Sequence, residues 1–114
     1  MKLTDLNPRW VGAGGEGIYL STQDYELGIC APEREGVGII FDCPCGDRVE
    51  HHQCCIEFKN PLDGGECHNP RGVTWNRTGD TFETLTLTPS ILRSKEKGGC
   101  GWHGWITNGD IRLV

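Results

Sequence analysis

The sequence lacks an apolar run approaching the roughly eighteen residues that a membrane-spanning helix needs. It also lacks a cluster of basic residues, because 11 Lys and Arg are scattered among 16 Asp and Glu and the net charge is −5. An acidic chain without a basic patch is poorly suited to the phosphate backbone of nucleic acids. The opening residues, MKLTDLNP, contain no apolar segment typical of a secretion signal. We therefore expect a cytoplasmic chain that binds neither nucleic acid nor membrane.

Glycine and cysteine are abundant instead. The 114 residues include 17 Gly, 7 Cys and 4 His, and this length fits a single domain. An odd number of cysteines cannot be closed completely into disulfides within one chain, and a reducing compartment disfavours them further. Cys54 and Cys55 are adjacent, so in a strand their side chains would point to opposite faces. Metal binding, a catalytic thiol or simple burial remain as roles for these cysteines.

Short β-strands dominate the expected secondary structure. Residues 36–41 and 54–58 are rich in β-branched and aromatic side chains, and the first run ends at Asp42. Leu and Thr alternate over residues 84–88, which predicts a half-buried strand that stops at Pro89. Asn108-Gly109 lies between two apolar runs and is a strong hairpin signal.

The remaining segments are turn-forming. Residues 59–74 form the longest expected loop, and Ser90–Lys97 is a weak helix candidate in which Ser90 would be the cap. The sequence thus predicts a mainly β single domain over residues 1–114, with short antiparallel strands, long loops and a C-terminal hairpin. Within it, residues 1–35 are expected to be an irregular glycine-rich part and residues 36–114 a zinc-binding β core.

Two cysteine-containing turns suggest the metal. Cys43-Pro44-Cys45-Gly46 follows the first apolar strand, and Cys100-Gly101-Trp102-His103 precedes the hairpin. Zinc prefers four thiolate or imidazole ligands in a tetrahedron, and a structural ion would stabilise a small loop-rich fold. We predict a structural zinc site made by Cys43, Cys45, Cys100 and His103. Cys67-His68 or His51-His52 could replace one of these ligands.

A nucleophile is a competing possibility for some of the same residues. Ser90 follows a strand end, where a hydroxyl can be held still, but it needs a histidine within hydrogen-bond reach. The spacing of the four histidines is not diagnostic, and there is no G-x-S-x-G elbow. From spacing alone, a turn or cap role for Ser90 is favoured. Cysteine nucleophiles are possible at Cys54, Cys55 or Cys67, each of which has a histidine nearby in the sequence.

The four tryptophans, at positions 10, 75, 102 and 105, are expected to supply core volume. Trp102 and Trp105 bracket His103, however, and such a cluster beside a site could bind a peptide.

Several motifs together resemble a known family. They are GIIFDCPCG at residues 38–46, Trp75, LTLTPSI at residues 85–91 and CGWHGWITNG at residues 100–109. This set is similar to a family of small phage and bacterial proteins that is catalogued as a domain of unknown function and sometimes labelled ammonia monooxygenase. The resemblance covers about residues 36–112, and one branch of the family accompanies bacterial ubiquitin-like conjugation operons as a candidate peptidase.

The resemblance implies a hydrolase in which Ser90 is the nucleophile, with a ubiquitin-like protein or a similar peptide as substrate. An oxyanion would then be held by backbone N–H groups near residues 98–101. Both hypotheses use His103, but they compete for it. An imidazole nitrogen that binds zinc has no lone pair left to accept a proton. We favour the metal for His103, since C-x-x-H on a turn is a good half-site on its own.

Two functions follow from these alternatives. One is a zinc-binding, serine peptidase-like hydrolase in a ubiquitin-like pathway, with Ser90 and His103 as catalytic candidates. The other is a non-enzymatic, zinc-stabilised interaction or accessory module of a phage, located in the host cytoplasm. A protein or peptide partner fits both, and the sequence leaves the oligomeric state open.

Overall fold

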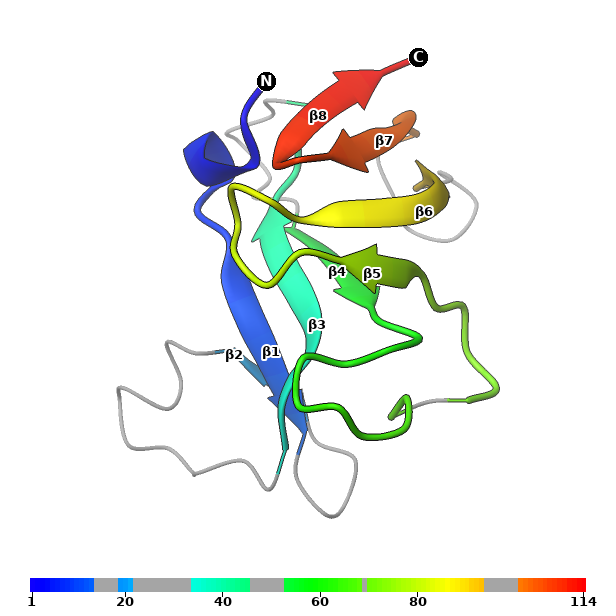
Figure 1. Cartoon of the computed structure of the whole chain (residues 1–114). Helices are drawn as coiled ribbons and strands as arrows, with labels where there is room; N and C mark the ends of the chain where they lie inside the picture. The colour runs from blue at the N-terminus through cyan, green and yellow to red at the C-terminus, as the bar shows by residue number, and fades with distance from the viewer. Residues whose placement is uncertain (14–18, 22–33, 46–52, 69, 94–100) are drawn as a thin grey trace.

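The computed structural model describes residues 1–13, 19–21, 34–45, 53–68, 70–93 and 101–114. Within these ranges a short 3₁₀-helix, η1, is followed by eight strands (Figure 1). Their bounds are η1 Leu3–Leu6, β1 Arg9–Ala13, β2 Tyr19–Ser21, β3 Arg34–Asp42, β4 Gln53–Glu57, β5 Asn76–Thr78, β6 Thr86–Leu92, β7 His103–Thr107 and β8 Asp110–Leu113. In this part of the chain no helix is long and apolar enough to cross a membrane.

The strands form two antiparallel sheets. Their orders are β2-β1-β3-β4 and β5-β6-β7-β8 (Figure 1). One apolar cluster joins the two sheets, because Phe41 and Ile56 of the first pack in the same core as Leu87, Ile91 and Ile106 of the second. The expectation of a mainly β fold with short antiparallel strands is confirmed.

Strand β1 corrects the expectation of an irregular N-terminal part. Arg9–Ala13 pairs with both β2 and β3, so it is an interior strand of the first sheet. Trp10 anchors it by stacking on Phe82, with ring centroids 4.5 Å apart, and by an edge contact with Phe58. The flanking glycines and Pro8 argue locally against a strand, whereas β3 and the Phe82 ring, which hold β1 in place, lie farther along the chain.

Strand β6 corrects a second expectation. It does not stop at Pro89 but continues to Leu92, so residues 90–92 are strand and not the start of a helix. Leu87 lies opposite Ile106 and Ile91 opposite Gly104, which places the three residues 88–90 across from Trp105 alone. Pro89 fits inside this bulge, since a bulged residue need not donate a hydrogen bond to the neighbouring strand.

The C-terminal hairpin agrees with its prediction. Asn108 and Gly109 have φ angles of 47° and 69°, the left-handed conformations that a two-residue type I′ turn requires. The N-terminus lies along β8, because Leu3 donates to the Gly109 carbonyl at 2.8 Å and Ile111 donates to the Met1 carbonyl at 2.7 Å. The second sheet is therefore extended at this edge by the first residues of the chain.

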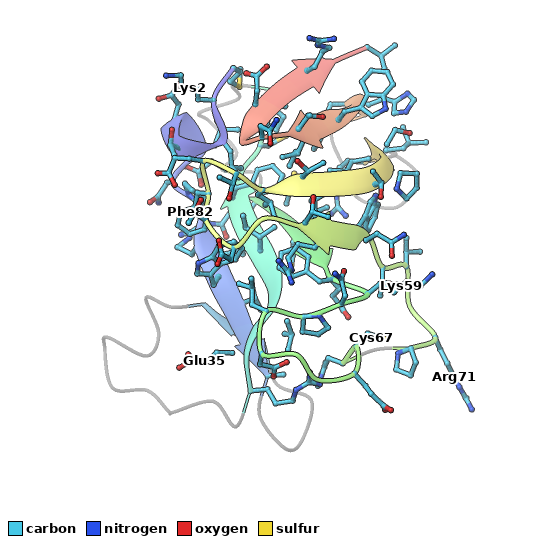
Figure 2. All side chains as sticks on the ribbon, in the orientation of Figure 1. Lys2, Glu35, Lys59, Cys67, Arg71 and Phe82 are labelled. Carbon is cyan, nitrogen blue, oxygen red and sulfur yellow. The ribbon has the colours of Figure 1, made fainter. Side chains whose placement is uncertain are left out.

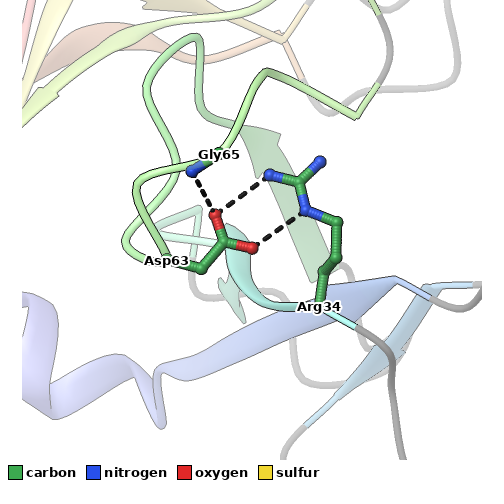
Figure 3. Close-up of polar contacts among 3 residues, drawn as sticks. All are labelled: Arg34, Asp63 and Gly65. Atoms are coloured by element: carbon green, nitrogen blue, oxygen red, sulfur yellow. Dashed lines mark hydrogen bonds and ion pairs between the residues drawn. The ribbon is translucent and has the colours of Figure 1, made fainter.

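The long 59–74 loop is tied to the start of β3 by an ion pair (Figure 3). Arg34 donates two hydrogen bonds to the Asp63 carboxylate, at 2.9 and 3.0 Å, and the Gly65 backbone N–H donates a third at 2.8 Å. The hydrogen bonds from Arg34, with a smaller contribution from Gly65, lower the pKa of Asp63. A charged Asp63 thus holds the loop against the first sheet.

Candidate active site

Ser90 and His103 lie in contact. The His103 Nε2 atom is 3.0 Å from the Ser90 Oγ atom, and both residues are partly buried. This is the separation expected between a serine and the histidine that activates it. The two residues are brought together by the pairing of β6 with β7, in which Leu92 lies opposite His103.

The bulge in β6 and the alternation in β7 place both side chains on the same face. Along β7, Gly104 and Ile106 are buried, whereas His103, Trp105 and Thr107 are more exposed. In β6, Leu87 and Ile91 are buried, and the bulge between them leaves Ser90 on the outer side. Successive residues in a strand point to opposite faces, so the Ser90–His103 pair lies on the outer face of the second sheet.

Trp75 holds the backbone of Ser90. Its indole Nε1 donates to the Ser90 carbonyl at 3.3 Å, and the side chain is buried in the core. The Trp75 backbone is itself fixed to the end of β4, because its N–H donates to the Glu57 carbonyl at 2.9 Å and its carbonyl accepts from Lys59 at 2.7 Å. The expectation for Trp75 was core volume, which its burial bears out. Its place among the motifs that carry the family resemblance was the one sequence signal of a more specific role.

A groove lies next to this pair on the same face. It has a volume of about 340 Å³ and is lined by Trp105, Thr107, Asp110 and Arg112. The Trp105 ring lies 5.8 Å from the His103 ring, centroid to centroid. Trp105 therefore lines the groove and also lies beside the serine–histidine pair. Trp105 is 41% exposed, unlike Trp75 and Trp102, which are buried in the core as expected.

The zinc prediction remains untested. Cys43 is buried and Cys45 exposed, while Cys100 and the His51-His52 pair fall outside the described residues. Within the described ranges, no three His, Cys, Asp or Glu side chains are grouped so as to hold a metal ion. Cys67 lies on the 59–74 loop, at the opposite end of the view from β7 and β8 (Figure 2).

The cysteine alternatives to Ser90 have unfavourable surroundings. Cys54 is buried, and its sulfur accepts a hydrogen bond from the Trp102 indole at 3.4 Å. Desolvation raises the pKa of the Cys55 thiol, and the nearby Glu57 carboxylate raises it further. A nucleophilic cysteine needs the opposite shift. Cys54 and Cys55 face opposite sides of β4, as expected for neighbours in a strand.

One of the backbone N–H groups predicted to hold an oxyanion is already used within the fold. The Gly101 N–H donates to the Arg93 carbonyl at 2.7 Å, so it is already committed within the fold. The other candidates, residues 98–100, lie outside the described residues. Arg93 also donates through its own N–H to the Trp102 carbonyl at 2.9 Å, which closes the turn before β7.

Comparison with known proteins identifies the family. No curated protein and no solved structure matches the chain. Residues 19–114, by contrast, match the family described as bacterial ubiquitination-like system serine protease (BubE). The match spans most of the chain and includes Ser90, His103 and all strands from β2 onward. The chain therefore belongs to the BubE family of bacterial ubiquitination-like system serine proteases.

Proposed function

We propose that this protein is a serine peptidase that cleaves a ubiquitin-like protein, with Ser90 as nucleophile and His103 as general base. The observation that carries the proposal is the 3.0 Å contact between His103 Nε2 and Ser90 Oγ on the outer face of the second sheet. The family description supports the reaction class and the pathway. The assignment of the two residues rests on their geometry.

The reaction uses the two side chains in succession. With the Nδ1 atom of His103 carrying the ring proton, Nε2 accepts the proton of the Ser90 hydroxyl as Oγ attacks the substrate carbonyl carbon. The resulting imidazolium returns that proton to the leaving amine, the carbon–nitrogen bond breaks and an acyl-enzyme forms. Water then attacks the ester, again giving a proton to Nε2, and the proton returns to Ser90 as the acid product leaves.

The surroundings favour a dyad held by packing. Among the described residues, none accepts a hydrogen bond from His103 Nδ1, so no carboxylate orients the ring there. The ring instead lies against Trp105, and the Ser90 backbone is held by Trp75. An aromatic neighbour restricts the ring by contact, while the hydrogen bond from Trp75 restricts the bulge that carries the nucleophile.

The zinc hypothesis assigns the opposite tautomer to the same ring. A metal bound at Nδ1 would leave the proton on Nε2, which would then donate to Ser90 Oγ and could not accept its proton. A structural zinc on His103 and a catalytic role for His103 therefore exclude each other. The tautomer of His103, observed by ¹⁵N NMR, separates the peptidase from the zinc-stabilised interaction module.

Labelling with a fluorophosphonate probe tests the proposal directly, because such probes react with activated serines. We expect the wild-type protein to be labelled at Ser90, as located by peptide mass spectrometry. Ser90→Ala should abolish labelling, and His103→Ala should slow it by about 100-fold or more. Thr88→Ala, which removes an exposed hydroxyl from the same bulge, is the matched control and should be labelled like the wild type.

Folding of each variant is monitored by circular dichroism, so that a lost site is distinguished from a lost fold. A wild-type protein that the probe does not label would contradict the proposal. A folded His103→Ala variant that reacts as fast as the wild type would remove His103 from the mechanism.

A further inference from the structure

The groove beside the Ser90–His103 pair carries a charge without a partner. Arg112 lies on β8 directly opposite Trp105 on β7, and both line the groove. Within the described part of the chain, the Arg112 guanidinium makes no hydrogen bond and no ion pair. A guanidinium holds five N–H donors in a plane, which suits it to bind both oxygens of a carboxylate.

The other charge in the groove is already compensated. Asp110 contacts the ammonium group of Met1 at 3.4 Å, and it does not pair with Arg112. The uncompensated charge of the groove is thus positive, on a chain whose net charge is −5. An anionic group of a ligand is therefore attracted here although the protein as a whole is acidic.

The position of Arg112 relates this charge to the scissile bond. Strands β6, β7 and β8 are neighbours in that order, so Ser90 and Arg112 are separated by two strand spacings. At about 4.8 Å each, these amount to roughly 10 Å, and an extended peptide covers that distance in about three residues. A substrate chain leaving Ser90 across the sheet would pass the exposed Trp105 before it reaches Arg112.

We propose that this groove selects a peptide carboxylate about three residues from the scissile bond, with Arg112 binding the carboxylate and Trp105 contacting the intervening chain. This inference rests on the proposed peptidase function and names its substrate class. Two sources provide the same chemistry: the side chain of an Asp or Glu, or the α-carboxylate of a short C-terminal tail. The second source would make the protein a processing enzyme that removes about three terminal residues.

Protection of Ser90 from the fluorophosphonate probe tests the inference without a known substrate. Three pools of random hexapeptides are compared: free-acid peptides without Asp or Glu, amidated peptides with Asp and Glu, and amidated peptides in which Asn and Gln replace them. Each result is the ratio of labelling rates with and without peptide, so variants with different intrinsic rates remain comparable. At least one carboxylate pool should protect the wild type at about tenfold lower concentration than the neutral pool.

Arg112→Gln should abolish that preference, and Arg112→Lys should retain part of it, because the charge remains while the planar fork is lost. The control is Arg71→Gln, which removes an exposed cation on the 59–74 loop far from β8 (Figure 2) and should behave like the wild type.

The pool that protects identifies the source of the carboxylate. Equal or absent protection by all three pools, or a preference that survives Arg112→Gln, overturns the inference while leaving Ser90 labelling intact. A wild type that the probe fails to label overturns the proposed function itself.

Discussion

The two faces of the β6–β7 pair differ in composition and in exposure. The inner face presents Leu87, Ile91 and Ile106, each at most 1% exposed, to the core between the sheets. The outer face presents Ser90 and His103 beside the groove of Trp105. Burial of the inner face fixes the two strands, and the outer face inherits that fixed geometry. The comparison shows how core packing on one face of two strands can position a pair of side chains on the other face, without a hydrogen-bond network among many polar side chains.

The largest contrast is expected between a core variant and a site variant. Ile106→Ala removes a fully buried side chain from the inner face and should lower the free energy of unfolding by about 2–5 kcal/mol. Ser90→Ala should change it by less than about 0.5 kcal/mol, because it removes one partly buried hydroxyl. Urea unfolding of both variants measures the difference. Similar destabilisation by the two substitutions would show that Ser90 has a structural role in β6.

A smaller effect, on the reactivity of Ser90, is expected from substitution of Trp75, which is buried in the core and donates to the Ser90 carbonyl. Trp75→Phe removes the indole N–H that donates to the Ser90 carbonyl, so fluorophosphonate labelling should slow by about 5- to 10-fold. Trp102→Phe is the matched control, since Trp102 is equally buried but donates to Cys54. Labelling of this control should stay near the wild-type rate although both variants lose core volume. Equal slowing in the two would mean that Trp75 acts only through packing.

The smallest effect is expected at the Arg34–Asp63 pair, which is remote from the two faces. Because the folded pKa of Asp63 is lowered, its charged form stabilises the fold at neutral pH. That contribution, about 0.5–1 kcal/mol for a partly exposed pair, should be complete above the unfolded pKa near 4 and disappear as the pH falls through the lowered folded value.

Urea unfolding of the wild type and of Asp63→Asn, at pH 7 and then at stepwise lower pH, measures this contribution. The two proteins should differ at neutral pH and converge in acid. The Arg34→Gln variant and the double variant complete a thermodynamic cycle, which should show a coupling energy between the two side chains only where Asp63 is charged. A difference between wild type and Asp63→Asn that is independent of pH would contradict an ionic role for Asp63.

Sequence patterns were sufficient where the determining interactions are local. Alternation of Leu and Thr correctly predicted which side chains of residues 85–88 are buried, and Asn108-Gly109 predicted the hairpin and its turn. The resemblance to a family linked to bacterial ubiquitin-like operons agrees with the family model that matches residues 19–114. Each of these signals depends on neighbouring residues or on a short linear motif.

Predictions failed where a distant partner decides the conformation. Pro89 is a strand terminator by its local chemistry, yet β6 passes through it because the pairing with β7 places a bulge there. Arg9–Ala13 is a strand because β3 and the Phe82 ring supply its partners. The sequence by itself determined the β character and the hairpin, since these follow from local backbone preferences, and its family resemblance suggested Ser90 and His103 as catalytic candidates. Only the tertiary structure decided that the two side chains meet at 3.0 Å, because the register between β6 and β7 is set by non-local core packing.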